Sequence, residues 1–316
     1  DDRLKVDHLE NLGALLPTPQ EVAGISKLSG SAHPAEMFLA TACKFYPDLP
    51  KRLECYLHMT HLAESCESGL GKATKLVEAC NEIISNDKLA RVLQKMLAVG
   101  NVMNQGTYRG NATGFTVDSL LRMINMKGAD KKTTVLDYVV KSLYDRGEER
   151  VLVVAEDLAV LESASKISGT EIGKQLGEVD STYESMHQEL TKVKEQLKAG
   201  DAGRRSPQPN GVSSPPPPAG GSNMSELFAS RLEQHLTEQL PRIEEVRRYR
   251  RLLLRKVTEV VEYFGEDTAK CDTVSIFGVL QEFRNALTNS KNALIRRERS
   301  LARAKQAKSP ESRQSV

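Results

Sequence analysis

Two helical stripes on either side of a proline-rich segment constrain this chain more than any other feature. Residues 200–223 read GDAGRRSPQPNGVSSPPPPAGGSN, a composition that cannot bury apolar surface. Before this segment, apolar residues recur at alternating steps of four and three, the spacing of a coiled-coil seam: Ile172, Leu176, Val179, Tyr183, Met186, Leu190, Val193 and Leu197. After it, similar spacing links Leu236, Ile243, Val246, Leu253, Val257, Val260 and Phe264. Each stripe can cover the other, so the pattern predicts a long antiparallel helical hairpin with residues 200–223 as its flexible tip.

Helical periodicity also runs through the first half of the chain. It predicts helices at residues 34–45, 48–61, 70–84, 87–102 and 130–144, and a last helix from 273 to about 305. Asn86 or Asp87, and Asp130, are the expected caps of the helices that follow them. The one short run that resembles a strand, residues 151–154, continues into a helix-forming sequence. We therefore predict an all-α fold.

Cysteine and apolar content limit where such a chain works. The five cysteines are scattered and form no CxxC pair, which favours a reducing, cytoplasmic compartment. Membrane insertion is not expected, because no stretch approaches the roughly 18 uncharged apolar residues that a spanning helix needs. The chain starts at Asp1 without a methionine, so we expect a fragment whose natural N-terminus lies upstream.

Constellations typical of enzymes are missing from the sequence. A glycine-rich run near residue 70 hints at a nucleotide loop, but Ala73 occupies the hydroxyl position that would meet magnesium. Four residues could share a helix face as metal ligands, yet core leucines interleave with them and no second ligand pair follows: Cys55, His58, His61 and Cys66. We predict no enzyme activity, no catalytic residue, no metal and no cofactor.

Positive charge is concentrated late in the chain, although the net charge is only +2. Residues 242–256 hold seven basic side chains against two acidic ones, and residues 284–308 hold eight against one. Such stripes suit nucleic-acid phosphates or an acidic protein surface, but a solvated helix face is the commoner explanation. No nucleic-acid partner is expected.

Residues 100–123, GNVMNQGTYRGNATGFTVDSLLRM, break the helical pattern. The spacing of Gly106, Gly110 and Gly114 suggests a phosphate cradle, but no strand precedes it. Asn101 and Asn104 tolerate left-handed backbone and can bond their own chain, so we expect a tightly folded loop that other backbone approaches closely. An ordinary connection between helices remains the alternative.

This segment resembles the signature of the formin homology 2 domain. The match runs over Gly100, Asn101, Asn104, Gly106, Arg109, Gly110, Ala112, Gly114 and Phe115, followed by Ser119 and Leu120. Further landmarks fall in family order: LPT at 16–18, AE-x-F at 35–38, P-x-L-x-x-RL at 47–53, KTT-x-L-x-Y at 132–138 and YFGED at 263–267. The resemblance spans residue 9 to about 303, with 200–223 as an insertion.

The resemblance implies an elongated helical domain that nucleates actin filaments and stays bound to their growing barbed ends in the cytoskeleton. Residues 1–199 then hold the knob remainder, coiled-coil and post helices, 224–308 hold the C-terminal post helices, and 309–316 form a disordered tail. The signature segment corresponds to the pocket in the post that receives the lasso of a partner subunit: Gly100, Asn101, Asn104, Gly106, Gly110, Gly114 and Phe115. Positions expected to contact actin are Arg109, Lys132, Arg247 and Arg251.

Departures from the family pattern lead to further expectations. Val102 stands where the family commonly has an aromatic, and Thr116 where a basic residue is frequent. The chain begins after the lasso and the first knob helices, so self-association through the post requires that arm, and we expect nucleation to be impaired without it. Profilin, at residues 215–218, and microtubules are further candidate partners. The alternative function is a helical coiled-coil scaffold without actin activity.

Overall fold

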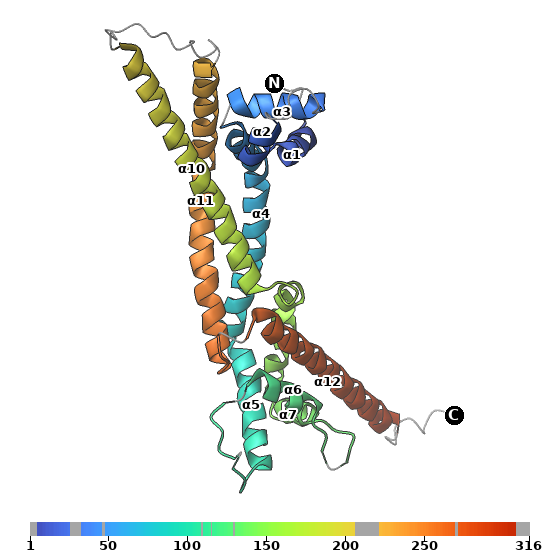
Figure 1. Cartoon of the computed structure of the whole chain (residues 1–316). Helices are drawn as coiled ribbons and strands as arrows, with labels where there is room; N and C mark the ends of the chain where they lie inside the picture. Colours follow the sequence, from blue (N-terminus) through green and yellow to red (C-terminus); the bar gives the residue numbers. More distant parts are fainter. Residues whose placement is uncertain are drawn as a thin grey trace. The chain divides into compact units, whose positions relative to one another are not determined.

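The structure is a computed structural model that describes residues 5–25, 33–45, 48–108, 110–114, 116–128, 130–205, 221–268 and 271–307 (Figure 1). Within these ranges the chain is helical and carries no strand, only an isolated bridge between Lys127 and Thr134. The predicted all-α fold is confirmed. Residues 206–220 and 308–316, which include the proline run and the predicted tail, lie outside the described residues.

The described helices are named in chain order. Their bounds are α1 Val6–Leu15, α2 Pro19–Ile25, α3 Pro34–Phe45, α4 Leu49–Ser85, α5 Asp87–Met103, α6 Val117–Asn125, α7 Val135–Asp145, η1 Glu149–Val153, α8 Val154–Asp157, η2 Leu158–Val160, α9 Leu161–Ala164, α10 Gly169–Arg205, α11 Gly221–Tyr263 and α12 Thr273–Ala307. None of the described helices is long and apolar enough to span a membrane.

The chain divides into two compact units. The first unit comprises Asp1–Gly69 and Leu176–Arg248, and the second comprises Leu70–Gln175 and Tyr249–Val316. In the first unit, α10 and α11 form the predicted antiparallel hairpin. Lys194 Nζ lies 2.6 Å from a Glu233 carboxylate oxygen, whereas Asp180, earlier in α10, pairs with Arg247, later in α11, at 2.7 Å. An earlier residue of α10 thus pairs with a later residue of α11, and this order shows that the two helices are antiparallel.

The apolar seam of the hairpin holds the first unit together. Its α10 residues are buried as the spacing predicts, apart from Leu197, which is half-buried. Tyr183 fits this buried seam because its hydroxyl donates to the Leu236 carbonyl at 3.2 Å. A glycine on α4 extends the packing, since a Cβ on Gly69 would lie 2.7 Å from Leu176 Cδ2. Glycine at position 69 therefore allows Leu176 of the seam to pack against the backbone of α4.

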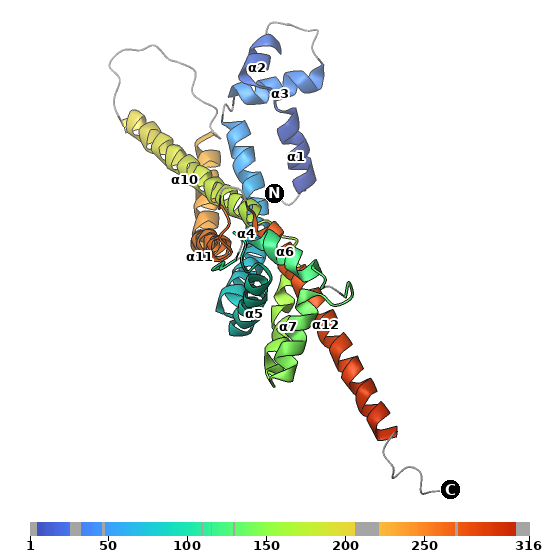
Figure 2. The ribbon, with the colours of Figure 1, turned by 90° about the horizontal axis from the view of Figure 1, so that it is seen from below.

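In the second unit, α6, α7, α8 and α9 pack against the first half of α12, and α5 packs against α7. Figure 2 shows α6 and α7 beside α12. Large side chains fill this core without exposure, among them Leu120, Leu136, Phe277 and Phe283. Buried polar groups join its parts: Asp137 of α7 accepts a hydrogen bond of 2.6 Å from the Ser290 hydroxyl of α12. The core thus fixes α5, α6 and α7, whose exposed sides carry the candidate site.

Several sequence-based helix boundaries were wrong. Helix α4 runs unbroken through residues 62–69, which the sequence assigned to a break, because Gly69 packs inside the first unit. Helix α7 begins at Val135 with Thr134 as its cap, and Asp130 serves the preceding turn instead. Helices α1, α2 and α6 were not predicted. Asn86 caps α5 as predicted, since its side chain accepts from the Leu89 amide at 2.9 Å.

Candidate functional site

The end of α5 carries an exposed apolar surface in the second unit. Val102 and Met103 are 71% and 51% exposed, Tyr108 in the following loop is 89% exposed, and Tyr138 on α7 is 59% exposed. Large apolar side chains that are exposed close to one another mark a binding surface more often than single ones do. Two grooves flank this helix end.

The first groove, here called the Gly100 groove, lies between α5, the loop after it, α6 and the end of α11. Its volume is about 1020 Å³, and its walls include Leu97, Met123, Met126 and Tyr263. Gly100 leaves room for Met123, whose Cε would lie 3.1 Å from a Cβ at position 100. Small residues on α5 and in the loop thus open an apolar floor between aromatic and methionine side chains.

Hydrogen bonds to its own backbone fold the loop of this groove. Asn101 Oδ1 accepts from the Ala112 amide at 2.8 Å, and Asn101 Nδ2 donates to the Ala112 carbonyl at 2.9 Å. A Cβ on Gly110 would lie 2.9 Å from the Asn104 carbonyl oxygen, so only glycine fits that close approach. Gly106 adopts the left-handed region with φ of +79°. The expected tightly folded loop, approached closely by other backbone, is confirmed.

The segment after α11 closes the other wall of the Gly100 groove. Glu266 accepts a hydrogen bond of 3.0 Å from the amide of Val117, which opens α6. Thr116 caps the same helix through Ser119. The ring of Tyr263 stands edge-on to Phe264, and burial raises the pKa of its phenol. Glu266 therefore ties the YFGED segment to the start of α6 and fixes the width of the groove.

Predicted pocket residues are only partly together in this groove. Gly100, Asn101, Asn104 and Gly114 line it, whereas Gly106 and Gly110 shape the loop behind it. Phe115 and Arg109 lie outside the described residues. The role of these residues in receiving a partner stays a prediction.

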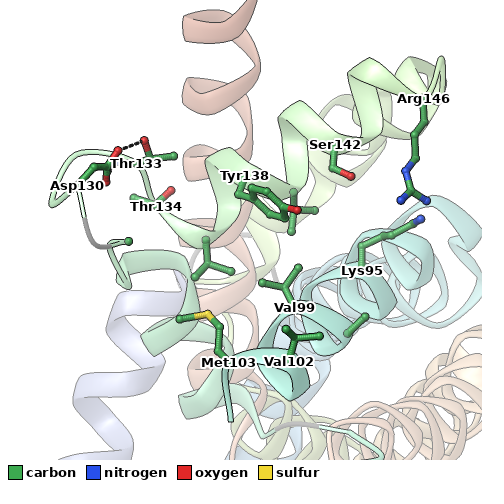
Figure 3. A pocket seen from close by; sticks show the side chains of 14 residues that line it. Lys95, Val99, Val102, Met103, Asp130, Thr133, Thr134, Tyr138, Ser142 and Arg146 are labelled. Carbon is green, nitrogen blue, oxygen red and sulfur yellow. Dashed lines mark hydrogen bonds between the residues drawn. The ribbon is translucent and has the colours of Figure 1, made fainter. Parts of the chain in front are cut away.

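The second groove, here called the Tyr138 groove, lies between α5 and α7 and has a volume of about 780 Å³ (Figure 3). Val99, Val102 and Tyr138 form its apolar middle. Lys95 and Arg146 stand at one end, and Asp130 and Thr133 at the other. The groove is therefore apolar along its length, with positive charge at one end and negative charge at the other.

Hydrogen bonds within the chain hold both ends of the Tyr138 groove. At one end, a hydrogen bond from the Thr133 hydroxyl, helped by amides of Thr133 and Lys132, lowers the pKa of the Asp130 carboxyl. At the other end, Glu148 lies 2.7 Å from Arg91 and 3.9 Å from Lys95, and the Arg91 hydrogen bond lowers the pKa of the Glu148 carboxyl. Both carboxylates stay ionised at neutral pH.

Sequence reasoning did not find the Tyr138 groove, although a signal was present. Apolar and small residues at helical spacing face it from both helices: Val99 and Val102 on α5, and Val135, Tyr138, Val139 and Ser142 on α7. The sequence reads these stripes as core, because burial and exposure at a groove produce the same spacing. Only the exposed fractions of Val102 and Tyr138 show that these residues line a groove and are not part of a buried core.

The predicted actin-contacting cations have different surroundings. Lys132 is exposed in the turn before α7, and its backbone amide bonds to Asp130. Arg251 is exposed on α11 in the second unit. Arg247, in the first unit, donates to Asp180 at 2.7 Å and to Glu184, and its guanidinium lies 5.9 Å from the Tyr183 ring centroid. Lys132 and Arg251 thus offer their charge to solvent more freely than Arg247.

Cysteines and histidines of the described residues form no metal centre. No group of three His, Cys, Asp or Glu within those ranges is arranged to hold an ion. Burial raises the pKa of the Cys55 thiol to about 11 and that of the Cys80 thiol to about 12. Both thiols are therefore protonated and unreactive at neutral pH.

Comparisons with known proteins agree with this architecture. A family model for the Formin Homology 2 Domain matches residues 1–288. The chain belongs to the formin homology 2 family. Formin-like protein 6 of Oryza sativa subsp. japonica is 26% identical over 287 residues, covering 90% of this chain and 19% of that protein. Formin-like protein 20 of Arabidopsis thaliana is 26% identical over 309 residues, covering 94% and 17%.

A shorter match has higher identity. Formin-like protein 21b of Arabidopsis thaliana is 31% identical over 192 residues, which cover 60% of this chain and 47% of that protein. The chain therefore spans about a fifth of the length of the two longer relatives and about half of this one.

Proposed function

We propose that this formin homology 2 chain binds the barbed ends of actin filaments and promotes filament nucleation when two chains are paired. The exposed apolar surface at the end of α5 carries the proposal. Val102, Met103 and Tyr138 are exposed along the Tyr138 groove, and Tyr108 is exposed at the Gly100 groove. Burying such a surface against an apolar segment of a second chain is favourable.

The Gly100 groove is the proposed receptor for the arm of the partner chain. Its small residues let an inserted aromatic ring approach the backbone, and Met123, Met126 and Tyr263 supply adaptable apolar walls. A ring held there is buried on several sides, which suits an anchor residue of a protein interface. Pairing of two chains would then place two copies of the actin-contacting surface around one filament end.

Exposed cations are the proposed contacts to actin. Lys132 and Arg251 extend into solvent, and an acidic filament surface attracts such charges over a distance set by the salt concentration. Arg109 and Arg247 remain proposed contacts from the family pattern. No bond is made or broken in this function, because exchange of surface contacts is sufficient to follow a growing filament end.

Elongation of preformed actin seeds tests the proposal. Increasing amounts of this chain should change the rate of barbed-end growth and leave pointed-end growth unaffected. Lys132→Asp with Arg251→Asp should weaken this effect, and so should Arg109→Asp, whereas Lys166→Asp, at another exposed position, should not. Unchanged elongation at every concentration, with normal helix content, would favour the helical scaffold instead.

Pairing is tested separately by filling the Gly100 groove. Position 114 suits this change because nothing lies within 4 Å of a Cβ there, so Gly114→Leu adds a side chain without an internal clash. In a chain that carries the proposed arm, this variant should lower the dimer fraction measured by sedimentation velocity. Gly71→Leu, at an exposed position with equal space, is the matched control. Equal dimer fractions for all three proteins would exclude the groove as the receptor.

A further inference from the structure

The C-terminal part of α12 extends beyond the family domain. The family match ends at residue 288, whereas α12 continues to Ala307, an extension of roughly 28 Å at 1.5 Å per residue. Figure 2 shows this part of α12 running past α6 and α7, with no other described helix of the second unit beside it. The function proposed above assigns no task to it.

Three arginines occupy one side of this extension. Residues 296, 299 and 303 fall within an arc of about 60° at 100° per residue, on the side opposite the buried line of Leu287 and Ser290. We call Arg296, Arg299 and Arg303 the arginine face. All three side chains are exposed, and none has an ion pair or a hydrogen-bonded carboxylate among the described residues.

Basic residues nearer the core of the second unit behave differently. Arg284 donates to the Ala155 carbonyl at 2.7 Å and lies 3.9 Å from Glu162. Lys291 lies 3.2 Å from Glu156. These two cations hold α12 against α8 and α9. The arginine face lies beyond these contacts with α8 and α9, so its charges do not help to hold α12 in the second unit.

The arginine face also weakens the helix that carries it. Like charges three and four residues apart repel, and each such pair costs an isolated helix about 0.2–0.5 kcal/mol. Within residues 291–304 the single acidic side chain, Glu298, offsets only part of five basic ones. An external anion would remove this repulsion, so the face is better matched to a bound partner than to the free chain.

Neighbouring charges and the scarcity of apolar residues distinguish between anionic partners. Glu156 and Glu162 pair with Lys291 and Arg284 beside the inner half of α12, so these two cations are not available to an extended polyanion, such as duplex nucleic acid or a membrane lying along the helix. A membrane also needs a broad apolar side, and here only Leu294, half-buried, and Leu301, 47% exposed, continue that line. A compact cluster of carboxylates on a protein needs neither further cations along the helix nor a broad apolar side.

We infer that the arginine face binds a carboxylate-rich patch on the side of an actin filament, apart from the filament end. This inference rests on the proposed function, which supplies a filament as the acidic protein surface. The face spans about 10 Å from residue 296 to 303, so it fits a patch on one subunit. Guanidinium groups suit the task because they bind carboxylates with two parallel hydrogen bonds.

Co-sedimentation with filaments whose barbed ends are blocked tests the inference. The full chain should pellet with such filaments, and added salt should weaken the binding. Arg296→Gln, Arg299→Gln and Arg303→Gln together should raise the dissociation constant at least tenfold. Lys72→Gln, Lys75→Gln and Lys166→Gln together remove the same charge from exposed positions of the second unit and should change it less than twofold. Circular dichroism checks that both variants keep their helices, since glutamine is a good helix former.

Other outcomes would overturn the inference. These are no binding to blocked filaments, equal binding by the arginine variant and the unaltered chain, and tighter binding to phosphatidylserine vesicles or to duplex DNA than to filaments. The seed-elongation experiment separates the two proposals, because it reports on filament ends. An effect on barbed-end growth without side binding removes only the arginine-face inference, whereas no effect on growth removes the proposed function.

Discussion

At the scale of single residues, Thr273 joins two distant parts of the second unit. Its fully buried hydroxyl accepts from the Gly169 amide at 2.8 Å and lies 3.4 Å from the Ile167 carbonyl. Thr273→Val keeps the shape but leaves the Gly169 amide without its partner. We expect the free energy of unfolding to fall by about 1–3 kcal/mol, the cost of an unsatisfied buried group, in chemical denaturation.

A second threonine on α12 provides the control for this prediction. Thr288 is exposed, and its hydroxyl bonds only to the Arg284 carbonyl one turn earlier. Thr288→Val should therefore change stability by less than about 0.5 kcal/mol. Equal losses in the two variants would show that β-branched valine in α12, and not the Gly169 contact, causes the effect.

A substitution at Asn101 tests how the loop of the Gly100 groove is held in place. Asn101→Asp keeps the acceptor for the Ala112 amide but places a carboxylate oxygen against the Ala112 carbonyl, where the native amide donates. We expect hydrogen exchange in residues 104–114 to accelerate about tenfold, the equivalent of 1.4 kcal/mol of local opening, with little change in global unfolding. Unchanged exchange in this loop would contradict the bidentate role.

The sequence predicted part of this loop and could not predict the rest. Asn101 and the glycines indicated a loop that bonds its own backbone, since these residue types tolerate such conformations. The left-handed residues are Gly106 and Asn111, however, and not Asn101 or Asn104. Which residue takes that conformation depends on the tertiary contacts around it, so residue type alone leaves several choices open.

At the scale of elements, Asp137 gives α7 a pH-dependent anchor. Burial raises the pKa of its carboxyl. Hydrogen bonds from the Ser290 hydroxyl and from Thr134 together lower this pKa by more than burial raises it, so the pKa lies below its usual value. A lowered folded-state pKa contributes stability above the unfolded value of about 3.9, and this contribution is lost as the pH falls through the folded value.

Asp137→Asn should therefore act mainly at neutral pH. The variant loses the charged acceptor of the hydrogen bonds from the Ser290 hydroxyl and from the Thr134 amide, and we expect the melting temperature at pH 7 to fall by a few degrees. The difference from the unaltered chain should shrink as the pH is lowered below 4, because protonation removes the same charge. A difference that stays constant with pH would show that the carboxylate charge is not involved.

The hairpin and α4 show what periodicity can and cannot predict at this scale. The steps of four and three were sufficient for α10 and α11, because a seam that is buried along its length repeats with the helix. The expected break covered residues 62–69, which end at Gly69, a residue that weakens a helix in isolation. Packing of Gly69 against Leu176 favours the helix there, and such a contact between residues over a hundred positions apart cannot be predicted from local sequence.

Arg247 is predicted to contribute to the hairpin as well as to actin contact. Its guanidinium bridges Asp180 and Glu184 of α10, so Arg247→Gln should lower hairpin stability by about 1 kcal/mol at low salt. Arg251→Gln should leave stability unchanged, because no carboxylate pairs with it among the described residues. Thermal melts of both variants distinguish these roles. Equal melting temperatures of the two variants would show that Arg247 does not stabilise the hairpin.

At the scale of the whole molecule, family membership was recognisable from sequence but the binding surface was not. Motif order identified the formin homology 2 family, because those residue types and spacings recur along nearly the whole chain. The Tyr138 groove remained hidden, since Val102 and Tyr138 have the spacing of core residues. Recognition by motif therefore gave the family, from which a partner is proposed, whereas the candidate surface required the fold.

The proposed filament contact has a measurable salt dependence for the whole chain. The net charge is only +2, so long-range attraction by the molecule as a whole is weak, and contact depends on local cations such as Lys132 and Arg251. The Debye length shrinks from roughly 14 Å at 0.05 M to 7 Å at 0.2 M salt, which screens exposed charges. We expect end binding, measured by seed elongation, to weaken several-fold over this range.

Variants separate local from global electrostatics in that measurement. Lys132→Gln with Arg251→Gln should weaken end binding at low salt and flatten its salt dependence, because the screened pairs are then gone. Lys72→Gln with Lys75→Gln lowers the net charge by the same amount at exposed positions of α4 and should leave both binding and salt dependence as they were. If the two double variants behaved alike, the net charge of the molecule, and not the two proposed contacts, would govern attraction to the filament end.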